Sequence, residues 1–142
     1  MTTDTVISTD KSKLDVGLIH EFLRHSYWAE DIPLAVVEKS IANSLCFGVY
    51  EGASQVGFAR VITDYATFGY VADVFIIPAK QKQGLGKKLM AYILDFPALQ
   101  GLRRWHLLTL DAQNLYRQIG FDTPSNPEHH MEIRKSGLYK SE

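Results

Sequence analysis

The chain has 142 residues, of which 46% are hydrophobic and 22% charged, and its formal net charge is −1. These values are typical of one soluble globular domain over residues 1–142, and the near-neutral charge argues against a general nucleic-acid binder. No apolar run approaches the ~20 residues of a membrane span. The N-terminus lacks the apolar core of a secretory signal, and Cys46 alone cannot form an intrachain disulfide. We therefore expect a cytoplasmic protein without a nucleic-acid or membrane partner.

Apolar periodicity and turn residues predict alternating short strands and helices in the first half of the chain. In chain order, the expected elements are a strand at Thr5–Ser8, a helix from Leu14 to near Ser26, a helix from Pro33 to about Asn43, and strands at Leu45–Tyr50, Gln55–Thr63 and Tyr70–Ile77. The last three strands are joined by short turns, so they should form an antiparallel meander.

The second half of the sequence predicts a helix that crosses over the sheet and two further strands that rejoin it. Its expected elements are a helix from Lys87 to about Leu94, a strand at Trp105–Leu110, a short helix capped by Asp111 and closed by Gly120, a terminal strand at Met131–Arg134, and a frayed tail at 136–142. Because a helix separates the strand at Trp105 from the strand at Tyr70, these two strands should be parallel.

A basic glycine loop between Pro78 and the Lys87 helix is the most informative stretch. It brings backbone N–H groups and lysines to a helix N-terminus, which is an arrangement suited to phosphate. A dinucleotide fingerprint starting at Gly84 and Gly86 fails because its third glycine position is Leu89. A P-loop fails as well, since Gln81 and Lys88 stand where it needs glycine and a hydroxyl residue.

The remaining sequence, Gln81 to Gly86, resembles the Q/R-x-x-G-x-G/A signature of the GNAT superfamily of N-acetyltransferases. A second motif supports the resemblance: Leu110–Phe121 places Tyr116 shortly before Gly120 and Phe121, as that family does. The order of expected elements also matches the family over nearly the whole chain. The resemblance implies an α/β (α+β) fold with a mixed, mainly antiparallel sheet flanked by helices, and a parallel strand pair splayed around a CoA site.

The resemblance also implies that acetyl-CoA is the acetyl donor. Backbone groups of the loop would hold its pyrophosphate, and the preceding strand would pair with its pantetheine arm. The matching positions are Gln81, Lys82, Gln83, Gly84, Leu85, Gly86 and Lys87 for the loop, and Val74, Phe75 and Ile76 for the strand. Glycine at 84 and 86 would let the backbone approach the phosphates closely. We expect the backbone of Gln81, rather than a charge, to matter.

The resemblance implies that Tyr116 is the general acid, and a tyrosine is reasonably matched to the departing CoA thiolate. The alternative is a core tyrosine on the apolar helix face with Ala112 and Ile119. Asp73 is the expected general base, acting directly or through a water, or it is merely a solvated acid at a strand end. Asp64, Glu30 and Asp31 are weaker candidates for the base.

The acetyl acceptor would be a primary amine, either on a small molecule or on a peptide or protein. Aromatic residues that would line its pocket are Tyr27, Trp28, Tyr65, Phe68 and Tyr70. No metal is expected, since adjacent His129 and His130 on a strand would point to opposite faces. An exposed C-terminal strand would permit a homodimer. A non-catalytic acyl-CoA-binding or sensing module on the same fold is the alternative.

Overall fold

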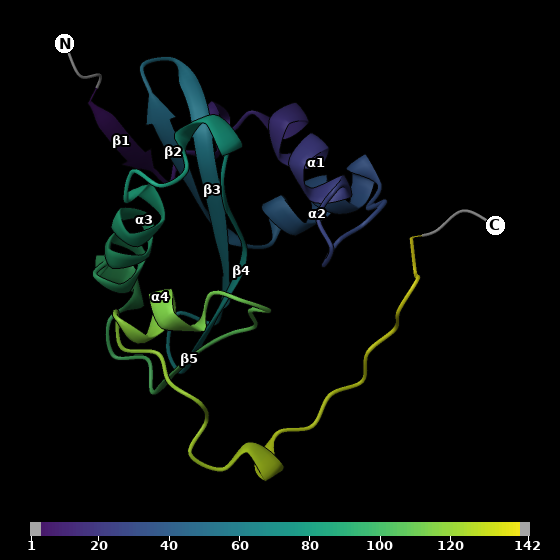
Figure 1. Cartoon of the computed structure of the whole chain (residues 1–142), viewed down its shortest axis with the longest axis vertical. Helices are drawn as coiled ribbons and strands as arrows, with labels where there is room; N and C mark the ends of the chain where they lie inside the picture. The colour runs from purple at the N-terminus through teal and green to yellow at the C-terminus, as the bar shows by residue number, and fades with distance from the viewer. Residues whose placement is uncertain (1–3, 140–142) are drawn as a thin grey trace.

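The computed structural model describes residues 4–139, which form one five-stranded sheet in the order β1-β2-β3-β4-β5 (Figure 1). Its strands are β1 (Thr5–Ser8), β2 (Leu45–Glu51), β3 (Ser54–Thr63), β4 (Phe68–Ile76) and β5 (Arg104–Leu107). The first four strands pair antiparallel, whereas β4 and β5 are parallel. The expected mixed, mainly antiparallel fold is confirmed.

Four α-helices accompany the sheet in the described chain: α1 (Val16–Arg24), α2 (Leu34–Ala42), α3 (Leu85–Leu94) and α4 (Gln113–Arg117). Short 3-10 turns lie at Lys11–Lys13, Pro78–Lys80, Pro97–Leu99 and Pro127–His129. Helices α1 and α2 cover one face of the sheet and α3 covers the other, while α4 lies next to β5 (Figure 1).

Two apolar clusters hold these layers together. On the α3 side, Leu89 and Met90 are fully buried against Phe47 of β2. On the α1/α2 side, Phe58 and Phe75 from the sheet pack with the two helices. Each such buried side chain stabilises the fold by about 1.5–3 kcal/mol, so the sheet is a firm support for residues at its edges.

Several boundaries differ from the sequence-based expectation. Helix α3 begins at Leu85, two residues before Lys87, because Gly84 adopts a left-handed conformation and serves as the N-cap. Strand β5 ends at Leu107 rather than Leu110. Asp111 does not cap α4: the N-cap position is Ala112, whose N–H donates to Thr109 Oγ at 3.0 Å.

The predicted terminal strand at 131–134 is wrong for this single chain. These residues are described but form no strand, and the side chains of Met131 and Ile133 are 95% and 93% exposed. An isolated strand has no partner for its backbone groups, so the apolar pattern alone cannot make one. Residues 136–139 form a turn, and the remainder of the predicted frayed tail, residues 140–142, lies outside the described part.

Candidate functional site

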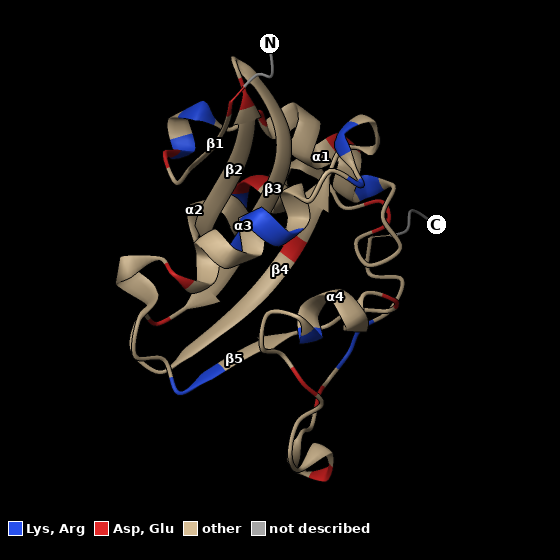
Figure 2. Cartoon of the chain, turned by 60° about the vertical axis from the view of Figure 1, so that its left-hand side comes forward, with Lys and Arg blue, Asp and Glu red and all other residues tan. Residues whose placement is uncertain are grey.

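The site begins with an irregularity in β4. Phe58 of β3 lies opposite Phe75, but Arg60 lies opposite Ala72, so β4 contains one extra residue between these pairs. Asp73 lies in this β-bulge with φ of +55°, a left-handed conformation uncommon outside glycine. The bulge bends the strand beside the point where β5 pairing ends, at Val71 and Leu107. Strands β4 and β5 therefore separate in a V beyond this point (Figure 2).

The open edge of β4 presents free backbone groups to this V. Ile77 N–H donates to Val56 C=O of β3 at 2.9 Å, and Phe75 is paired with Phe58. By the alternation of a strand, the C=O of Val74 and both backbone groups of Ile76 point away from β3, towards the opening. Of the three predicted strand positions, Val74 and Ile76 are thus available at the open edge, whereas Phe75 is turned to β3.

Gln81 covers part of that edge through its side chain. Its Nε2 donates to the C=O of Ile76 at 2.9 Å. The amide group of Gln81 thus occupies a hydrogen-bonding position on the open strand, in addition to the backbone role expected for this residue.

The glycine loop runs from this strand end into α3. Lys82 has φ of +64° and Gly84 has φ of +80°, so two of three consecutive loop residues adopt the left-handed conformation. The first intrahelical hydrogen bond is from Lys88 N–H to Gly84 C=O, which leaves the N–H groups of Leu85, Gly86 and Lys87 without helical partners. A Cβ built on Gly86 would meet no described atom within 4 Å. The space beside Gly86 in the first turn of α3 is therefore open.

The lysines around the loop are not equivalent. Lys80 forms an ion pair with Glu51, with Nζ and Oε2 2.9 Å apart, and is therefore already neutralised. Lys82 and Gln83 are exposed on the loop. Lys87 Nζ lies 3.5 Å from Gln118 Oε1 of the α4 region, which links the first turn of α3 to the other wall of the V. The first turn of α3 contains no acidic residue that would oppose an anion.

Tyr116 comes to the same opening from α4. The turn after the helix fixes it: Phe121 N–H donates to Tyr116 C=O at 3.1 Å, and the two rings meet edge to face at 5.9 Å. Gly120 has φ of +107°, which explains the glycine in the motif. Burial, with a smaller effect of Tyr27, raises the pKa of Tyr116 above its ordinary value. The phenol is therefore protonated throughout the neutral range.

A cavity of about 500 Å³ lies between β5, α4 and the segment that follows α4. Tyr116, Leu107 and Thr109 are among the residues that line it. The space is large enough for part of a small ligand.

On the α1/α2 face, a polar network surrounds Asp73. Trp28 Nε1–H donates to Oδ1 at 2.9 Å, and Arg60 Nε donates to Oδ2 at 2.5 Å. The side chains of Arg60 and Asp73 are only 17% and 9% exposed, so their ion pair is largely buried. Arg60 Nη1 also donates to Ser44 Oγ at 3.1 Å. Asp73 is thus neither a solvated acid nor an unpartnered carboxylate.

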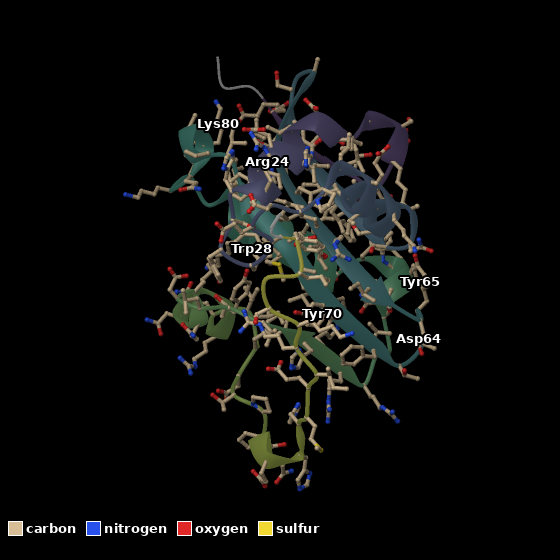
Figure 3. All side chains as sticks on the ribbon, turned by 90° about the vertical axis from the view of Figure 1, so that its right-hand side faces the viewer. Arg24, Trp28, Asp64, Tyr65, Tyr70 and Lys80 are labelled. Atoms are coloured by element: carbon tan, nitrogen blue, oxygen red, sulfur yellow. The ribbon has the colours of Figure 1, made fainter. Side chains whose placement is uncertain are left out.

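Three of the five predicted acceptor aromatics, Tyr27, Trp28 and Tyr70, lie near this network. Trp28 and Tyr70 lie on the same face of the sheet (Figure 3). Tyr27 meets Trp28 edge to face at 5.1 Å, and its hydroxyl accepts a hydrogen bond from Leu110 N–H at 3.3 Å. Burial, and to a smaller extent Asp73, raises the pKa of Tyr70, which stacks on His106.

The remaining candidate residues have different environments. Asp64 accepts backbone hydrogen bonds from Thr67 and Ala66, and these bonds hold its pKa well below the ordinary range. Asp64 therefore stabilises the turn between β3 and β4. Asp64 and Tyr65 lie at the far end of the sheet from Trp28 (Figure 3). Glu30 and Asp31 are exposed. Burial raises the pKa of the Cys46 thiol to about 11, so this cysteine is not a reactive nucleophile.

Comparison with known proteins agrees with this geometry. The family model of the acetyltransferase (GNAT) domain matches residues 42–123, which include the bulge, the loop and Tyr116. The chain belongs to the GNAT family of acetyltransferases. A Gibberella zeae protein assigned as an acetyltransferase is 35% identical over 136 residues, covering 80% of this chain and 76% of its own.

Solved GNAT structures extend the comparison to the whole fold. A Xanthomonas campestris protein of the family is 48% identical, with a TM-score of 0.95 over 99% of this chain and all of its own. At that coverage and TM-score, the similarity includes the segment after α4. The Neisseria gonorrhoeae N-acetylglutamate synthase, solved with coenzyme A and L-arginine, shares only the fold: it is 21% identical with a TM-score of 0.66, covering 89% of this chain and 29% of its own.

Arg60 and Ser44 are site residues that sequence reasoning missed. Arg60 stands in an apolar strand pattern, where an inward-facing arginine signals a buried acidic partner. Its partner could not be named because the bulge shifts the register.

Two further observations concern the part of the chain that the structure describes. None of its helices is long and apolar enough to cross a membrane. Within residues 4–139, no three His, Cys, Asp or Glu side chains gather as a metal site would require.

Proposed function

We propose that this GNAT protein transfers the acetyl group of acetyl-CoA directly to a primary amine. The observation that carries the proposal is the convergence of three features at one opening. The donor-rich N-terminus of α3, the free edge of β4 and the half-buried Tyr116 all border the V between β4 and β5. A thioester held there would meet the acid from one face of the sheet and the acceptor from the other.

The loop from Gln81 to Lys87 would hold the pyrophosphate of the donor. Its residues fit this role, because unpaired N–H groups at a helix N-terminus favour an anion and no side chain fills the space before Gly86. Lys82 and Lys87 add positive charge on either side. The C=O and N–H of Ile76, which point away from β3, would pair with the amides of the pantetheine arm, and Gln81 would first have to release the Ile76 carbonyl.

Tyr116 would donate its proton to the sulfur of the departing CoA thiolate as the amide bond forms. A tyrosine of raised pKa stays protonated at neutral pH and is therefore a reservoir for that proton. Tyr27, Trp28 and Tyr70 would surround the acceptor on the α1/α2 face. We do not propose a route through an acetyl-cysteine intermediate, since Cys46 is buried.

Asp73 would act as a positioning carboxylate. Both its oxygens already accept hydrogen bonds, one from Arg60 and one from Trp28. We therefore assign to Asp73 the orientation of Trp28 and the maintenance of the bulge, and the acceptor loses its proton to water.

The test is release of free CoA thiol from acetyl-CoA with a panel of amines: diamines, amino acids, and peptides carrying lysine or a free N-terminus. We expect turnover with at least one class. Cys46 contributes no background, because burial raises its pKa to about 11. Thermal stabilisation by CoA without turnover on any amine would instead indicate the non-catalytic acyl-CoA-binding module.

Replacing Gly86 by leucine tests the phosphate site. The new side chain would occupy the open space before the helix N-terminus, so we expect CoA to bind at least about tenfold more weakly, a loss of about 1.4 kcal/mol. Stability should not fall, since leucine exceeds glycine in helix propensity by about 0.8–1 kcal/mol. Calorimetric titration with CoA measures the effect. Ala91→Leu, an exposed position further along α3, is the matched control. Wild-type affinity in Gly86→Leu would exclude the loop as the phosphate site.

A further inference from the structure

His106 lies in β5 next to the point where the V opens. It is paired with Tyr70 of β4, and the pairing of the two strands ends one residue further along each of them. Its neighbours Trp105 and Leu107 pack against the apolar cluster under α3. Because successive side chains of a strand point to opposite faces, the imidazole of His106 lies on the other face. That face is the acceptor side of the sheet, where Trp28 and Tyr70 lie (Figure 3).

Neighbouring aromatic rings hold the imidazole of His106 in position. Tyr70 stacks on it with ring centroids 5.7 Å apart and 21° between the planes, and His130 stacks on it at 5.9 Å and 23°. Phe68 of β4 lies at 6.4 Å and is tilted by 30°. Stacking uses the faces of a ring, whereas both imidazole nitrogens lie at its edge. The orientation of the ring is therefore restricted while its nitrogens stay accessible.

The ring nitrogens of His106 have no hydrogen-bond partner among residues 4–139. The histidines of α1 differ in this respect. His20 Nε2 lies 3.0 Å from the C=O of Ile32, and His25 Nε2 lies 3.1 Å from a carboxylate oxygen of Glu21. A neutral imidazole has one nitrogen that can accept a proton. This capacity is unused in His106.

The other ionisable groups near the acceptor are less suited to accept a proton. Both carboxylate oxygens of Asp73 already accept hydrogen bonds within the polar network. Burial raises the pKa of Tyr70, so its phenol keeps its own proton at neutral pH. His106 also lines the same cavity of about 500 Å³ as Tyr116, so a free imidazole and the proposed acid border one space.

The surroundings of His106 keep it neutral. Burial, followed by the charges of protonated His130 and of Arg104, lowers the pKa of the imidazole below its ordinary value of 6.5. The nearby acid Glu132 acts on Tyr70, which is itself protonated at neutral pH. His106 is therefore unprotonated at neutral pH and can take up a proton. It loses this ability as the pH falls through its lowered pKa.

We propose that His106 is the general base of acetyl transfer and receives, through the intervening water, the proton that the acceptor amine gives up. This inference rests on the proposed function. Loss of one proton from the ammonium frees the lone pair of its nitrogen, and the C–N bond forms as the C–S bond breaks. Tyr116 protonates the sulfur, and the second proton of the nitrogen returns to Tyr116 through solvent. His106 then releases its proton, so each turnover yields one amide, one CoA thiol and one proton.

The first test is His106→Phe, which keeps a ring to stack on Tyr70 but has no nitrogen. With saturating amine at neutral pH, we expect kcat to fall at least about 100-fold, while the affinity for CoA and the circular dichroism spectrum are retained. Wild-type kcat should also decrease on the acidic side, as His106 becomes protonated, and this acidic limb should be absent in His106→Phe. His25→Phe changes an exposed histidine outside the V and is the matched control.

The second test moves the acidic limb without removing the base. His130→Phe keeps the stacked ring and removes a positive charge that opposes protonation of His106, so the pKa of His106 should rise. The acidic limb of kcat should then shift to higher pH, whereas a packing role of His106 predicts no shift. An unmoved limb, or equal kcat in His106→Phe and His25→Phe, would refute His106 as the base and leave the proposed function intact. If the wild-type chain releases no thiol with any amine, both are refuted.

Discussion

Replacing Tyr116 by phenylalanine is expected to lower kcat for acetyl transfer by about 100- to 10,000-fold while CoA binding is retained. The change removes one hydroxyl, and no hydrogen bond from a described residue contributes to the raised pKa of this group. The contact between the ring and Phe121 is kept, so the fold should not be affected. Steady-state thiol release gives kcat, and titration calorimetry gives the affinity for CoA.

The pH dependence of kcat distinguishes a general acid at position 116 from a residue that has only a packing role. Burial raises the pKa of Tyr116, so its proton is present at neutral pH and is lost only above the usual tyrosine range near pH 10. The fall in wild-type kcat that Tyr116 causes should therefore lie on the strongly alkaline side, and this limb should be absent in Tyr116→Phe. Tyr92→Phe on the outer face of α3 removes a hydroxyl far from the V and is the matched control. Equal kcat in Tyr116→Phe and Tyr92→Phe would remove Tyr116 from the mechanism.

The central features of the fold could be predicted because local chemistry determines them. Pro78 ends a strand and Gly84 permits the left-handed conformation that starts α3, so the strand–loop–helix unit follows from residue types alone. Periodicity likewise located Thr5–Ser8 and the hairpin of β2 and β3. The terminal strand at 131–134 could not be predicted in this way, since a strand exists only where a second backbone accepts its hydrogen bonds.

The site was only partly predictable for a related reason. Gln81 to Gly86 and Tyr116 lie in contiguous motifs, but the Arg60–Asp73 pair joins neighbouring strands across a bulge. A one-residue bulge changes which side chains meet, and no local signal in β4 announces it. The side-chain bond from Gln81 to Ile76 was missed because the motif was interpreted through its backbone alone.

The Asp73→Asn substitution is expected to lower the free energy of unfolding by about 3–5 kcal/mol, because it leaves the largely buried Arg60 cation without its partner. Asparagine suits the test, since it tolerates the left-handed conformation at this position and keeps an oxygen for the Trp28 N–H. The loss is therefore assignable to the charge rather than to the backbone. Urea unfolding at neutral pH measures it.

The matched control is the double variant Arg60→Gln/Asp73→Asn, which removes both charges together. Because neither group is then left as an unpaired ion, the double variant should be more stable than the sum of the two single losses predicts, with a coupling of about 0.5–3 kcal/mol. If the stability losses of the two single variants simply add in the double variant, the ion pair makes no specific contribution to the stability of the fold.

The same double variant decides what Asp73 does in the reaction. If Asp73 orients Trp28 and maintains the bulge, a neutral hydrogen bond between the two introduced amide side chains restores much of that geometry, and kcat should recover relative to Asp73→Asn alone. If Asp73 takes the proton of the amine, the double variant still lacks a base and kcat should remain as low as in the single variant. We expect recovery, because both carboxylate oxygens of Asp73 already accept hydrogen bonds, one from Arg60 and one from Trp28, and these bonds hold the two neighbours in place.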